Sequence, residues 1–171
     1  MFSYVVLIIL FVFFEALFSG SEIALFSVNK TKLKYKAAEG NKKAQKVYNL
    51  LEKYYNQYIY VGLVGTILSI TLATSTFVAM LHDMSVIFPI LKSKEEIFAE
   101  AIVIITLLFG EIIPKSVFQH YADELIYVIV EFLEFFRKVF KPFLWFAEGV
   151  NKVVFFLFRI KSKQEKYYTK E

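Results

Sequence analysis

The sequence contains no cysteine, which excludes disulfides and thiolate metal sites. Its two histidines, His82 and His120, lie too far apart in the chain to suggest a zinc-binding motif. No nucleophile–base pair and no HExxH-type motif is present, so we do not expect an enzyme.

The composition is that of a membrane protein. Hydrophobic residues make up 57% of the chain and aromatic residues 19%, with a mean hydropathy of +0.52. Soluble globular chains contain roughly 45–50% apolar residues. The net charge is +4, but the basic residues flank hydrophobic runs, where they orient a chain in a bilayer. We therefore expect a lipid bilayer as the environment and no nucleic-acid partner.

Three apolar runs, near residues 3–27, 57–81 and 97–118, are long enough to cross the hydrocarbon, which takes about 20 helical residues. A cleaved signal peptide is the competing interpretation of the first run, because Ser19, Gly20 and Ser21 are small. No basic residue precedes its apolar core, however, and hydrophobicity resumes after Glu22. The pattern favours an all-α membrane protein with three retained transmembrane helices.

The connector over residues 29–55 carries eight lysines against Glu39 and Glu52. Gly40 and Asn41 break it into two short helical pieces, which predicts a helical hairpin. Because basic connectors stay in the cytoplasm, the hairpin is predicted to be cytoplasmic and the N-terminus outside. The loop predicted over residues 82–96 has few basic residues and suits the outer side.

Residues 121–160 are predicted to form amphipathic juxtamembrane helices, interrupted at Pro142, that lie in the membrane interface. Flanking lysines and arginines keep this end cytoplasmic. Residues 1–160 thus form one multi-pass domain in the cell (inner) membrane, and residues 161–171 form a polar C-terminal tail.

The third run ends in a stretch typical of an ion site. Pro114 has no N–H to donate to the carbonyl of Gly110, and Glu111 places a carboxylate at membrane depth, where an unpaired charge is costly. A freed carbonyl beside a carboxylate suits a hard cation such as magnesium or calcium. The alternative is a proline kink in which Glu111 pairs with Lys115 one turn later.

Polar residues in the first run share one helical face. Glu15, Ser19 and Glu22 follow an i, i+4, i+7 spacing, and intramembrane carboxylates normally face a bundle interior or a water-filled cavity. Ser21 points elsewhere on an ideal helix. The alternative is that both serines bond back to carbonyls of their own helix while Glu22 sits at the interface.

The second run carries small residues along one side, among them Gly62, Gly65, Ser69 and Ala73. The hydroxyls of Thr66 and Ser69 and the carbonyls near Gly65 can add oxygen ligands. Close packing against another helix, of this chain or of a second copy, explains the same stripe.

Two motifs resemble a known family. Residues 18–25, FSGSEIAL, resemble the FSGSETAL signature of the CNNM/CorB/CorC divalent-cation transporters, and residues 109–115, FGEIIPK, match that family's FGEILPK. The lysine-rich connector with Glu39, Gly40 and Asn41 is similar to the family's AEEGN stretch. The resemblance covers essentially the whole chain as the family's transmembrane domain.

The resemblance implies three transmembrane helices, a cytoplasmic hairpin, a C-terminal amphipathic juxtamembrane belt helix and a homodimer. It also implies transport or export of magnesium, with sodium as a coupling ion, at a site between the first and third helices. The expected metal ligands are Ser21, Ser69, Gly110 and Glu111. Further candidates, as second ligands or a coupling-ion site, are Glu15, Ser19, Glu22, Gly65 and Thr66.

The sequence departs from the family pattern in two respects. Gly65 and Ser69 stand where the family's second helix usually has two asparagines, so two amide oxygens are missing. The cytoplasmic CBS-type regulatory domains expected of the family are absent from this chain. A non-transporting membrane scaffold or regulatory subunit that keeps the transporter fold is therefore the alternative function.

The topology is testable by placing a single cysteine in this cysteine-free chain. Asn41→Cys is expected to react with a membrane-impermeant thiol reagent only after the cells are opened, because the lysine-rich connector is predicted to be cytoplasmic. Labelling of residue 41 in intact cells would reverse the orientation.

Overall fold

The computed structural model describes residues 1–87 and 95–157, and this part of the chain is all-α. Three helical segments are long and apolar enough to cross a membrane, Phe2–Ser27, Lys42–Val86 and Glu100–His120, as expected from the sequence. The elements are α1 (Phe2–Ser27), α2 (Lys30–Ala38), α3 (Lys42–Ile87), α4 (Glu95–Thr106), the π-helical segment η2 (Leu107–Ile112), α5 (Ile113–His120), α6 (Ala122–Val139) and α7 (Lys141–Leu157).

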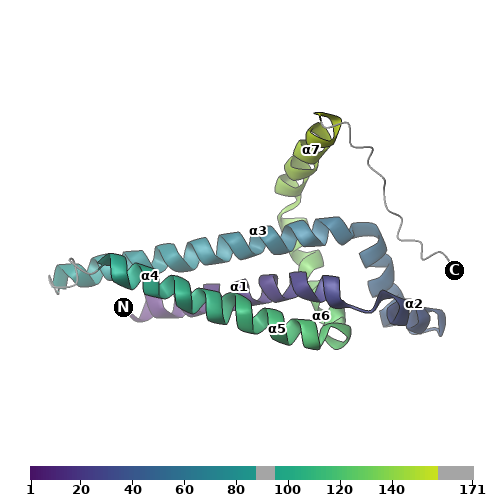
Figure 1. Cartoon of the computed structure of the whole chain (residues 1–171), viewed down its shortest axis with the longest axis horizontal. Helices are drawn as coiled ribbons and strands as arrows, with labels where there is room; N and C mark the ends of the chain where they lie inside the picture. Colours follow the sequence, from purple (N-terminus) through teal and green to yellow (C-terminus); the bar gives the residue numbers. More distant parts are fainter. Residues whose placement is uncertain (88–94, 158–171) are drawn as a thin grey trace.

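The three spans lie side by side (Figure 1). α1 packs against α3 along its length and against the third span, which runs through α4, η2 and α5. α2 lies at one end of the bundle, α6 crosses near that end, and α7 extends away from it (Figure 1). α6 is therefore the element that contacts α1, α3 and α5 together.

Two boundaries differ from the prediction. The second piece of the connector is not a short helix, because α3 continues without interruption from Lys42 to Ile87. No glycine or proline occurs between residues 42 and 61, and buried Ala44, Val47 and Leu51 keep one face apolar throughout. The loop predicted over 82–96 is also shorter, since residues 82–87 and 95–96 are helical. Residues 88–94 and the predicted 161–171 tail lie outside the described residues.

The hairpin turn lies where the sequence placed it. Gly40 has a φ of +91°, a left-handed conformation that suits glycine, and the side chain of Asn41 accepts hydrogen bonds from the first amides of α3. The connector thus reverses direction between α2 and α3.

The hydrophobic core is concentrated at the end of the bundle that carries α2. It joins the second half of α1, α2, the start of α3 and the apolar face of α6. Phe18 of α1 is 4.8 Å from Phe136 and 5.0 Å from Phe132 between ring centroids. The first half of α1, by contrast, exposes apolar side chains such as Phe2, Ile9 and Phe13, as expected of a surface that faces lipid.

A polar network fastens α6 to α3. Tyr58, fully buried on α3, donates a hydrogen bond of 2.9 Å to the carboxylate of Glu134. Arg137 donates two further bonds to Glu134, of 2.7 and 2.8 Å, and one of 3.1 Å to Gln57. Its guanidinium also lies 3.8 Å from the ring centroid of Tyr54. The buried phenol and the carboxylate therefore both have partners.

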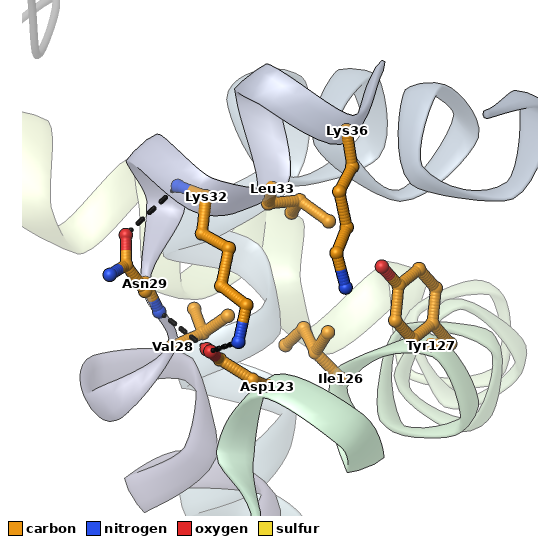
Figure 2. Close-up of a pocket in the computed structure, with 8 residues that line it drawn as sticks. All are labelled: Val28, Asn29, Lys32, Leu33, Lys36, Asp123, Ile126 and Tyr127. Atoms are coloured by element: carbon orange, nitrogen blue, oxygen red, sulfur yellow. Dashed lines mark hydrogen bonds and ion pairs between the residues drawn. The ribbon is translucent and has the colours of Figure 1, made fainter. Parts of the chain in front are cut away.

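A second polar contact joins α2 to α6 (Figure 2). Asp123 accepts hydrogen bonds from Lys32 Nζ at 2.8 Å and from the backbone N–H of Asn29 at 2.9 Å. These two bonds, led by that of Lys32, hold the pKa of Asp123 below its ordinary value. Asn29 also caps α2 by accepting from the backbone N–H of Lys32.

The stripe of small residues on α3 faces α1 of the same chain where the structure shows its neighbours. A Cβ at Gly65 would overlap the ring of Phe18, and one at Gly62 would lie 3.6 Å from Glu22 Cβ. This stripe is therefore used within the protomer, and the expectation of a homodimer depends on the resemblance alone.

The close packing at Gly65 predicts opposite effects of the same substitution at neighbouring sites. Gly65→Ala is expected to lower the free energy of unfolding by about 1–3 kcal/mol, because the new methyl group must displace Phe18. Gly62→Ala meets only ordinary contacts and is expected to stabilise α3 by up to about 1 kcal/mol. Thermal unfolding in detergent measures both, and equal stabilisation by the two variants would contradict the packing.

Candidate functional site

A carboxylate without a partner lies at the centre of the bundle. Glu15 is 0% exposed, and neither of its carboxylate oxygens has a hydrogen-bond partner in the described part of the chain. Ser19, one turn later on the same face of α1, is also 0% exposed, and its Oγ has no partner there either. Because buried polar groups are almost always paired, two adjacent unpaired ones indicate a ligand site.

Gly110 of η2 receives this carboxylate. The carboxyl group of Glu15 occupies the place where a Cβ on Gly110 would lie. Any other residue at position 110 would push the third span away from α1 or expel Glu15. Thr106, fully buried one turn earlier, donates its hydroxyl to the carbonyl of Val103 at 3.0 Å and adds a second oxygen-bearing side chain to this part of the third span.

The backbone of the third span widens at this point. Residues Leu107–Ile112 form a π-helical segment, and the N–H of Ile113 donates to the carbonyl of Leu108, five residues back. Pro114 follows directly and has no N–H for the carbonyl of Gly110. The sequence predicted a disturbed helix before Pro114, and the disturbance takes the form of a π-turn, which often marks functional sites.

A second group of charged side chains, Glu22, Glu111 and Lys115, lies next to Glu15. Glu111 is part-exposed, and its Oε2 is 3.4 Å from Lys115 Nζ, so the ion pair considered as the alternative is present. The charges of both Glu111 and Lys115 act on Glu22, which is half-buried on α1, and the charge of Glu111 also acts on Glu15. Within the described residues, this face of α1 therefore has a carboxylate without a hydrogen-bond partner at Glu15 and, at Glu22, a carboxylate on which the charge of Lys115 acts.

Two other predicted ligands donate their hydroxyls to carbonyls of their own helices. Ser21 is buried and donates its hydroxyl to the carbonyl of Leu17, and Thr66 donates to the carbonyl of Gly62 at 3.0 Å. Both hydroxyls keep lone pairs for a cation. Ser69 is buried on the same face of α3, at 5% exposure, and Gly65 is covered by Phe18.

The acidic and histidine side chains do not form a cage. In the two described ranges, no three of them come together as a group that could hold a metal ion. A cation here would need the Glu15 carboxylate together with hydroxyl and backbone oxygens, a donor set compatible with magnesium, which retains several waters.

The sequence did not point to Thr106, although a lone hydroxyl four residues before Gly110 in an apolar run was the available signal. It also did not show that Gly20 allows α5 to approach α1. A Cβ at Gly20 would be 2.6 Å from the ring of Phe118. Gly20 thereby allows α5 to pack directly against α1.

Comparison with known proteins gives a consistent result. The family model described as the cyclin M transmembrane N-terminal domain matches residues 6–171. A UPF0053 protein of Haemophilus influenzae is 28% identical over 95% of this chain and 37% of its own length. The UPF0053 inner membrane protein YfjD of Escherichia coli is 25% identical over 86% of this chain and 33% of its own length.

A further relative, the polyamine export protein of Haemophilus influenzae, is 27% identical over 100% of this chain and 41% of its own length. The chain thus spans 33–41% of the length of these curated relatives.

The contact between Glu15 and Gly110 can be tested by a compensating pair. Gly110→Ala is expected to lower the free energy of unfolding by about 1–3 kcal/mol, because its methyl group collides with the Glu15 carboxyl. In a Glu15→Ala background the same change is expected to be neutral or stabilising. Thermal unfolding in detergent with a chelator measures the cycle, and Gly149→Ala, in open space, is the control. Equal losses in both backgrounds would contradict the contact.

Proposed function

The chain belongs to the cyclin M (CNNM) transmembrane-domain family, and we propose that it carries a small cation across the membrane through the Glu15 site. The observation that supports this most is the fully buried carboxylate of Glu15, which has no hydrogen-bond partner among the described residues and lies one turn from the hydroxyl of Ser19. Such a group is costly at membrane depth, and a bound cation removes that cost.

The formal charge near the site favours a cation with two charges. Among the described residues of the first and third spans, the charged side chains other than Glu100, at the start of the third, are Glu15, Glu22, Glu111 and Lys115. With all three carboxylates ionised, as binding of a metal cation requires, they and the one ammonium leave two negative charges without compensation. A single divalent cation neutralises them.

Magnesium is the proposed substrate. It prefers oxygen ligands, and the polar groups around Glu15 and Gly110 are carboxylate, hydroxyl and backbone carbonyl oxygens. The ligands that the resemblance implies are Ser21 on α1, Ser69 on α3, and Glu111 and the Gly110 carbonyl on η2, and both α3 and η2 pack against α1. Sodium is the proposed coupling ion and a homodimer the proposed assembly, both on the resemblance alone.

A polyamine is the second candidate substrate, because one relative is named a polyamine export protein. A linear polyamine carries several ammonium groups, and the carboxylates at two levels of α1, Glu15 and Glu22, suit two of them. Glu111 would then bind the same ammonium as Glu22. The two substrates make different demands, since an ammonium donates hydrogen bonds whereas magnesium accepts electron pairs.

The test is transport by the chain in proteoliposomes, with magnesium and with spermidine in separate assays. Glu15→Gln keeps the shape of the side chain and removes its charge, so it is expected to reduce transport of the true substrate at least about tenfold, equivalent to ~1.4 kcal/mol of lost cation stabilisation.

The matched control is Glu131→Gln, which removes an exposed carboxylate of α6 that pairs with Lys46 near the start of α3, and which is expected to transport normally. Magnesium or spermidine flux identifies the substrate, and an imposed sodium gradient tests coupling. Absence of both fluxes in the wild-type chain would favour the scaffold or regulatory function instead.

A further inference from the structure

Among the described residues, Lys115 is the single cation in the group of charged side chains Glu15, Glu22, Glu111 and Lys115. It lies on α5, one helical turn after Glu111, with its Nζ 3.4 Å from Glu111 Oε2. The two side chains are 36% and 29% exposed, so neither is sealed in the bundle. A pair of this kind is weak and can open without disturbing the fold.

The charge of the Lys115 ammonium also acts on a carboxylate of a second helix, α1. Glu22 of α1 is attracted by Lys115 and repelled by Glu111. Glu22 Cβ packs beside Gly62 of α3, and Gly20, two residues earlier, is in close contact with Phe118 of α5. α1 and α5 are therefore held close together, and the ammonium that pairs with Glu111 also acts on Glu22 through its charge.

Glu22 and Glu111 lie next to the Glu15 site along the bundle. Glu22 follows Glu15 by seven residues on the same face of α1, or about 10 Å along the helix axis. Glu111 is the neighbour of Gly110, against which Glu15 packs. A cation that moved along this face from Glu15 toward the end of the bundle with α2 would approach Glu111, next to Gly110, and Glu22, on the same face of α1.

We propose that Lys115 is a tethered counter-cation. Its ammonium pairs with the Glu111 carboxylate when no transported cation is bound, and the transported cation displaces it. This role rests on the proposed transport function. The four-carbon stem of lysine allows the ammonium to swing out while the helix stays in place. Because the cation must compete with an ammonium that is always present, binding is weaker than three carboxylates alone would make it, and release is correspondingly faster.

Competition between Lys115 and the transported cation predicts the direction in which substitution of Lys115 changes the affinity for that cation. Lys115→Met keeps the length and apolar body of the side chain and removes the competing charge. It is expected to lower the dissociation constant for the cation about tenfold and to slow turnover in proteoliposomes, since release becomes harder. Lys115→Arg keeps the charge and is expected to remain within about threefold of the wild-type constant.

The decisive comparison repeats Lys115→Met in a Glu111→Gln background. If Lys115 acts by occupying Glu111, its removal is expected to change the dissociation constant less than threefold there. Isothermal titration with magnesium chloride, and in parallel with spermidine, measures the four proteins of this cycle. Lys46→Met, which removes an equal charge from the exposed pair with Glu131, is the control for general electrostatics and is expected to leave the constant unchanged.

The outcomes separate this role from the transport function. Wild-type chain that binds neither cation would overturn both. Binding that depends on Glu15 but is weakened or unchanged by Lys115→Met would leave transport standing and reduce Lys115 to a structural partner of Glu111. An equal effect of Lys115→Met with and without Glu111 would show repulsion at a distance, and would overturn displacement.

Discussion

The structure depends on the close approach of α1 to its neighbours at positions that have no side chain. The ring of Phe18 packs directly on Gly65 of α3, and the carboxyl group of Glu15 packs directly on Gly110 of η2. The ring of Phe118 of α5 packs on Gly20 of α1 in the same way. Small residues allow such contact in a membrane, where burial from lipid contributes little to helix association. The consequence is that one polar face of α1 is closed off from lipid by the other two spans.

The rotation of α1 is determined at the end of the bundle that carries α2. Phe18 lies between α3 and the aromatic rings of Phe132 and Phe136 on α6, and α6 is itself fastened to α3 through the buried Tyr58 and Glu134. Since Ser19 follows Phe18 directly, the packing of the ring also decides where the neighbouring hydroxyl points. α6 therefore helps to orient the site residues of α1 but supplies none of the predicted ligands.

The arrangement has a chemical consequence for the candidate site. Glu15 is fully buried and has no hydrogen-bond partner among the described residues, whereas Glu111 pairs with the ammonium of Lys115. The first carboxylate is thus the costly one, and the second is compensated internally. A site with one unsatisfied anion next to one occupied anion can attract a cation and still let it leave, as a carrier requires.

The sequence by itself determined the membrane class, the three spans and the break at Gly40, because apolar length, lysine placement and a left-handed glycine are local properties. It also located the polar residues from which the site is built. Only the tertiary structure decided which of them lack partners. Ser21 satisfies its hydroxyl within α1, but Ser19 does not, and Glu15 is buried by a glycine 95 residues further along the chain. Periodicity places a residue on a face, whereas the partners of its polar atoms depend on which helix packs there.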